Sequence, residues 1–122
     1  KHQVIIAGDI NDKRFKKYIS FLLNLSLNNP NIKFLNKLSE YEKKIFFESI
    51  DILILPSTNS FEAFGIVQLE AMSYGIPVIS TNINGVRTII KSTNNGYLFN
   101  KNNIDEIYLK VLLSKQNKNN PI

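Results

Sequence analysis

The sequence predicts an α/β fold, a Rossmann-like doubly wound parallel sheet of about five strands with flanking helices. Short apolar runs alternate along the chain with segments whose apolar residues have helical spacing, and turn-forming residues separate them. The run from Ile52 to Leu55 is apolar at every position, as is typical of a parallel strand covered on both faces. The 122 residues fit one domain, 1–122.

The first half of the chain contains two predicted strands and two predicted helices. A strand at 4–7 ends at Gly8, and a helix at 15–27 ends before Pro30. A second strand follows at 32–35. Ser39 then begins a helix that runs to about Ser49, and Glu42, three residues after Ser39, completes a capping box.

The second half repeats the alternation three times. A strand at 52–55 is closed by Pro56, and after a polar loop a helix at 65–74 ends at Gly75. Pro77 opens a strand at 78–81, and a short helix runs from 84 or 85 to about 91. A strand at 97–99 and a helix at 104–113 complete the pattern. The remaining polar tail is expected to be loose.

Composition excludes several classes of protein. The chain has no Cys and one His, which excludes disulfides and thiolate or histidine zinc sites. Its formal net charge is +5, and one basic cluster comprises Lys13, Arg14, Lys16 and Lys17. A solvated helix face explains this cluster, while contact with an anionic membrane surface stays open. We expect no nucleic-acid partner, because aromatic residues do not interleave with the cluster.

The candidate site follows the third strand, because ligands of open parallel sheets bind beyond the carboxyl ends of strands. Glu62 lies in the loop there, and the helix that starts at Gly65 offers free amides and a dipole that suit a phosphate. Glu70 lies farther along that helix, where sugar or ribose hydroxyls would be natural partners. On spacing alone, a helix-capping Glu62 and a surface Glu70 explain the residues equally well.

The stretch from Phe61 to Thr81 resembles the signature of retaining glycosyltransferases of the GT-B fold, group 1 or family 4, in their C-terminal, donor-binding domain. The signature is a glutamate, seven residues and a second glutamate, here Glu62 and Glu70, followed by Gly-x-Pro-Val, here at 75–78. The resemblance extends to 32–57, to 95–98 and to 4–9. It covers nearly the whole chain.

The resemblance implies a role for each site residue. Glu62 would be the catalytic position, in contact with the donor sugar near the reacting carbon, and Glu70 would accept hydrogen bonds from the ribose hydroxyls. The other donor-binding positions are Ala63, Phe64, Gly65, Ile66 and Val67 along the sugar and diphosphate, Asn36, Lys37 and Leu38 near the base, and Gly8. The substrate would be a UDP- or GDP-sugar, with no cofactor and no metal.

The chain departs from the family's pattern in places. Asn84 stands where the family often has a first glycine, Arg87 and Thr88 replace Pro and Glu, and a glycine expected near Asn36 is missing. Arg87 is either a ligand for phosphate or acceptor or a plain surface arginine. These changes affect the detail of the sugar pocket rather than the class.

We expect the complete enzyme to be larger than this chain. We expect a fragment of a two-domain enzyme, without its N-terminal acceptor domain and without the first strand and helix of this domain, and therefore inactive alone. The expected location is cytoplasmic, with peripheral contact to the inner membrane face left open. The alternatives are a non-catalytic transferase-like interaction module and a sugar-nucleotide epimerase. A nicotinamide site is excluded, because Gly-x-Gly-x-x-Gly does not follow the first strand.

Overall fold

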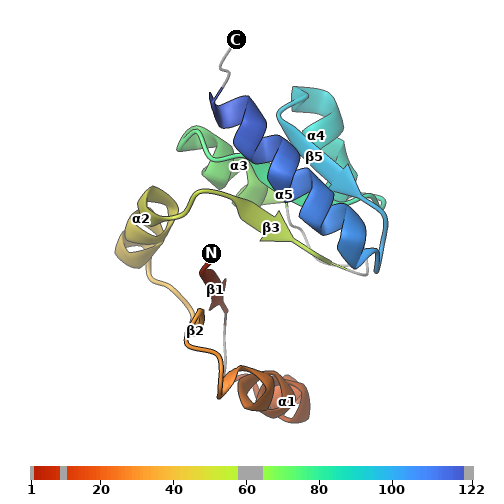
Figure 1. Cartoon of the computed structure of the whole chain (residues 1–122). Coiled ribbons are helices and arrows are strands. Elements are labelled where there is room, and N and C mark those ends of the chain that lie inside the picture. The colour runs from red at the N-terminus through yellow and green to blue at the C-terminus, as the bar shows by residue number, and fades with distance from the viewer. Residues whose placement is uncertain (1, 9–10, 58–64, 120–122) are drawn as a thin grey trace. The chain divides into compact units, whose positions relative to one another are not determined.

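The structure is a computed structural model that describes residues 2–8, 11–57 and 65–119. The chain comprises two compact units, Lys1–Ile45 and Phe46–Ile122, and each is described by itself. Figure 1 labels the helices and strands of both units. Its colours follow the chain from red at the N-terminus to blue at the C-terminus.

The first unit is built on two parallel strands. Strands β1 (Val4–Ala7) and β2 (Ile32–Leu35) pair with Val4 opposite Ile32. Between them lie a 3-10 turn, η1 (Lys13–Phe15), and helix α1 (Lys16–Ser26). The side chain of Asp12 caps η1, because its Oδ1 accepts a hydrogen bond from the Arg14 amide at 3.0 Å. The predicted strands have the observed bounds.

Helix α2 (Glu40–Ser49) begins at the predicted capping box. The Ser39 amide donates to Oε1 of Glu42 at 3.0 Å, and the Glu42 amide donates to Oγ of Ser39 at 3.2 Å. Each residue therefore satisfies a backbone donor of the other, which confirms the prediction. The helix continues into the second unit, where Phe47 is buried and stacks on Tyr74.

The second unit is a three-stranded parallel sheet in the order β3-β4-β5 with three further helices. Helices α3 and α4 pack against each other, and α5 crosses in front of β5 in Figure 1. The core lies around β4, which is buried at all four positions. The elements are β3 (Leu53–Leu55), α3 (Gly65–Ser73), β4 (Val78–Thr81), α4 (Val86–Thr93), β5 (Gly96–Phe99) and α5 (Ile104–Asn119).

The predicted α/β class is confirmed, with parallel strands in one sheet of two strands and one of three among the described residues. Two details of the prediction were wrong. Among the described residues β3 pairs only with β4, and Ile54 is 39% exposed, so one face of β3 is not fully covered within the second unit. The predicted loose tail is helical as far as Asn119, because Lys and Gln are good helix formers and the first helix-breaking residue is Pro121.

At Gly96, β5 lies so close to β4 that no space is left for a side chain. A methyl group on Gly96 would overlap the backbone oxygen of Val78 and would lie 3.2 Å from Cδ1 of Ile90. We predict that Gly96→Ala lowers the free energy of unfolding by about 1–3 kcal/mol, because the backbone must move to accept it. Urea denaturation measures the loss. Gly8→Ala is the control, since nothing lies within 4 Å of its added Cβ, and an equal loss in both variants would contradict the prediction.

The capping box makes helix α2 sensitive to pH. The hydrogen bond from the Ser39 amide, with a smaller contribution from the Ser39 hydroxyl, holds the pKa of Glu42 below its usual value. A lowered pKa in the folded state means that the carboxylate stabilises the fold above its unfolded pKa of about 4.3 and loses this effect as the pH falls through the folded pKa.

We therefore predict that Glu42→Ala is less stable than the wild type at neutral pH and that the difference disappears in acid, below the lowered pKa of Glu42. Thermal unfolding followed by circular dichroism at both pH values measures it. Glu48→Ala makes the same change at an exposed position of the same helix and controls for helix propensity. A difference that is independent of pH would exclude the carboxylate as the cause.

Candidate functional site

The carboxyl edge of the three-stranded sheet is held together by side chains as well as by the strands. The hydroxyl of Thr81, the last residue of β4, donates to the backbone oxygen of Leu55, the last residue of β3, at 3.2 Å. The Asn82 amide donates to the backbone oxygen of Phe99 at the end of β5 at 2.8 Å. The three strand ends therefore form one fixed edge, the edge at which parallel sheets bind ligands.

The described part of helix α3 begins at Gly65, the predicted first residue, and its first turn is the candidate anion site. The first four amides of an α-helix have no partner within the helix, and the dipole adds partial positive charge at that end. Ile66 is 68% exposed, whereas Val67 packs against the core. One side of the first turn is thus fixed by the core while the other faces solvent.

Glu70 lies on the same helix, less than two turns beyond Gly65. It is partly buried, between the exposed Leu69 and the fully buried Ala71. The helix therefore brings the predicted anion site and the predicted ribose acceptor together on one rigid element. The contact of Glu70 with a ribose stays a prediction.

The remaining predicted residues fall into two groups. Glu62, Ala63 and Phe64 lie outside the described residues, so their roles stay predictions. The other four, Gly8, Asn36, Lys37 and Leu38, belong to the first unit.

Within the first unit, the structure brings Gly8 to the start of the segment 36–38. The Gly8 amide donates to the backbone oxygen of Leu35 at 3.2 Å, so the chain leaves β1 and β2 at the same edge. The side-chain oxygen of Asn36 accepts a hydrogen bond from the Lys37 amide at 2.8 Å, and Leu38 is partly buried. Their contact with a nucleotide base stays a prediction.

A buried polar network joins α3, β4 and α4, and the sequence analysis missed it. Gln68 has 0% exposure. Its Nε2 donates to the backbone oxygen of Val86 at 3.1 Å, and its Oε1 accepts from the Ser80 hydroxyl at 3.4 Å. The signal in the sequence was a glutamine in an apolar helix and a polar pair, Ser80 and Thr81, at the end of an apolar strand.

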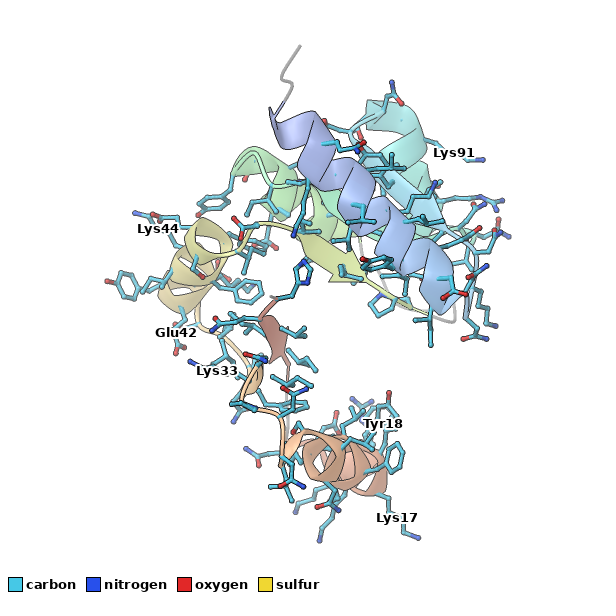
Figure 2. All side chains as sticks on the ribbon, viewed as in Figure 1. Lys17, Tyr18, Lys33, Glu42, Lys44 and Lys91 are labelled. Atoms are coloured by element: carbon cyan, nitrogen blue, oxygen red, sulfur yellow. The ribbon has the colours of Figure 1, made fainter. Side chains whose placement is uncertain are left out.

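The basic side chains are distributed over several elements. In the basic cluster, Arg14 pairs with Asp12 at 2.8 Å, and this hydrogen-bonded contact lowers the pKa of Asp12. Figure 2 labels lysines that extend from four different elements, Lys17 on α1, Lys33 on β2, Lys44 on α2 and Lys91 on α4. Arg87 donates to the side-chain oxygen of Asn84 at 2.5 Å, so this arginine has a local partner.

The ranges 2–8, 11–57 and 65–119 also bear on metal binding and on membrane insertion. No group of three or more His, Asp or Glu side chains there is placed to hold a metal ion. None of the helices in those ranges is long and apolar enough to cross a membrane.

The parallel sheet, the helix from Gly65 that follows β3 in the chain and the spacing of Glu62 and Glu70 in the sequence are those expected of a glycosyltransferase domain. The particular family follows from comparison with known proteins. Residues 1–121 match the family described as "Glycosyl transferases group 1", and the chain belongs to that family.

Individual relatives agree with this assignment. The chain is 33% identical to an uncharacterized glycosyltransferase of Methanocaldococcus jannaschii, over 88% of the chain and 29% of that protein. It is 31% identical to a glycogen synthase of Mycoplasma mobile, over 92% of the chain and 23% of that protein. It is 40% identical to an alpha-1,3/1,6-mannosyltransferase of Saccharomyces cerevisiae, over 62% of the chain and 15% of that protein. The chain thus spans less than a third of the length of these relatives.

The contact between Thr81 and Leu55 gives a prediction about the edge of the site. Thr81→Val keeps the shape of the side chain and removes the buried hydroxyl, so it should lower the free energy of unfolding by about 0.5–1.5 kcal/mol. Chemical denaturation measures the change. Thr93→Val is the matched control, because the Thr93 hydroxyl is exposed and its short hydrogen bond, to the Ile89 oxygen at 2.7 Å, lies within its own helix, with only a long 3.9 Å contact to Sδ of Met72 outside it. A Thr81→Val variant as stable as that control would show that the edge does not depend on this hydrogen bond.

Proposed function

We propose that the chain binds a nucleotide-diphospho-sugar donor at the carboxyl edge of its three-stranded sheet, for retaining transfer of a hexosyl group to an acceptor. The observation that carries the proposal is helix α3, which is hydrogen-bonded through Gln68 to Ser80 near the carboxyl end of β4 and carries the partly buried Glu70. Membership of the group 1 family and the mannosyltransferase among the relatives support a glycosyl donor.

The proposed chemistry assigns one part of the donor to each feature. The amides of residues 65–67 bind the diphosphate, and because they are already oriented, they stabilise the negative charge that develops as the diphosphate leaves. The carboxylate of Glu70 accepts from the ribose hydroxyls. Glu62 orients the sugar near the reacting carbon, and no metal or cofactor takes part. Gly8 and residues 36–38 remain the proposed contacts of the base.

The acceptor is proposed to come from outside this chain. The chain spans 29% of the Methanocaldococcus relative and 23% of the glycogen synthase, so most of each relative has no counterpart here. We therefore propose that an N-terminal domain of the same enzyme binds a glycan, lipid or small-molecule acceptor. The isolated chain then binds the donor and transfers nothing. A cytoplasmic location and peripheral membrane contact belong to the same proposal.

Saturation-transfer NMR with UDP- and GDP-sugars tests donor binding. We expect transfer from the protein to ribose and sugar protons of at least one donor, and a clear reduction in Glu70→Ala and Glu62→Ala. Glu48→Ala, which changes an exposed glutamate on α2, should bind like the wild type. No transfer to any donor would exclude the proposal and would favour an interaction module, while turnover of a donor by the chain alone would refute its inactivity.

A further inference from the structure

Gln68 is the most completely buried large polar side chain of the second unit. It has 0% exposure, and so does its partner Ser80. Burying an amide costs free energy unless its polar atoms find partners, and here both do. The Nε2 group donates to the Val86 oxygen at 3.1 Å, and Oε1 accepts from the Ser80 hydroxyl at 3.4 Å. A glutamine at this position therefore has a directional role that an apolar side chain would lack.

The position of Gln68 within α3 shows that these contacts hold the beginning of the helix. Gln68 is the fourth residue of a helix whose described part begins at Gly65, so its side chain leaves the helix directly after residues 65–67, whose amides have no partner within the helix. Its side chain leaves this turn on the buried side, whereas Ile66 is exposed. The same turn thus offers amides to a ligand and is fixed from behind by a hydrogen-bonded side chain.

The partners of Gln68 lie on the two elements that define the rest of the edge. Ser80 precedes Thr81, the residue that bonds to the end of β3. Val86 is the first residue of α4 and follows Gly85, whose φ of +84° requires the conformational freedom of glycine. Gln68 therefore ties the first turn of α3 to the carboxyl end of β4 and to the first turn of α4.

We propose that Gln68 is a positioning residue that fixes the first turn of α3 against β4 and α4 and thereby places the amides of residues 65–67 for the diphosphate. The inference rests on the proposed function. Amide donors are effective only at hydrogen-bonding distance and near-linear angles, so a small shift of the turn weakens several contacts with the diphosphate together. Gln68 touches no part of the donor in this proposal and acts only through the helix.

The test compares Gln68→Leu with Phe47→Leu in the 122-residue chain, with UDP and GDP as the probes. Phe47→Leu removes buried volume from the same core without removing a side-chain hydrogen bond and serves as the control for a loss of stability alone. Both variants are titrated at a temperature where circular dichroism shows them fully folded. We expect Gln68→Leu to bind the nucleoside diphosphate about tenfold more weakly and Phe47→Leu to bind like the wild type.

A double variant separates positioning from stability. Gln68→Leu with Ser80→Ala removes the unpaired hydroxyl that the single variant leaves buried, so it should recover part of the lost stability. Affinity should stay about tenfold reduced, because the polar tie to β4 and α4 is still absent. The amide resonances of Ile66 and Val67 should also be shifted in both Gln68 variants without ligand and unchanged in Phe47→Leu.

The outcomes separate the inference from the proposed function. If the wild type binds neither UDP nor GDP, both fail. If the wild type binds and Gln68→Leu binds equally well, the positioning role is wrong and the donor site stands. The positioning role is also overturned if Phe47→Leu loses as much affinity as Gln68→Leu, or if affinity returns together with stability in the double variant.

Discussion

The buried strand β4 is the constraint on which the rest of the second unit depends. It is the middle strand of its sheet, and β3 and β5 are both paired to it. All four of its residues are buried, so each side chain must fit its surroundings or find a hydrogen-bonding partner. Helices α3, α4 and α5 all contact it. A change in β4 would therefore alter every element that borders the candidate site.

The first two residues of β4 are apolar and the last two are polar, and the two pairs are held in the core in different ways. Val78 and Ile79 are apolar and fully buried, and the backbone of Val78 comes so close to β5 that only glycine fits at position 96. Ser80 and Thr81 are polar and equally buried, but both hydroxyls are hydrogen-bonded. The strand thus supplies hydrophobic packing at its beginning and directional contacts at its carboxyl end. Ligand sites on parallel sheets need fixed geometry at that second end.

Local features of the sequence predicted most of the elements. Apolar runs next to turn-forming residues predicted the strands 4–7, 32–35 and 78–81 with their observed bounds. The capping box predicted the start of α2. The length of α5 was missed, because a polar tail of Lys, Gln and Asn was interpreted by polarity rather than by helix propensity. The contacts of Gln68 join residues 12 and 18 positions apart. Such contacts depend on how the elements pack, which periodicity does not encode.

A bound anion can be stabilised by a lysine side chain or by the amides of a helix, and the two place different demands on the fold. A lysine can follow an anion by rotating its long side chain, so its attraction tolerates small errors in the backbone. A helix amide has no such freedom, and its contribution depends on where the whole helix lies. If a diphosphate is bound by the first turn of α3, the affinity is decided by the contacts that fix this turn. In this chain those contacts are apolar at Val67 and hydrogen-bonded at Gln68, so geometry at the site is a property of the core beneath it.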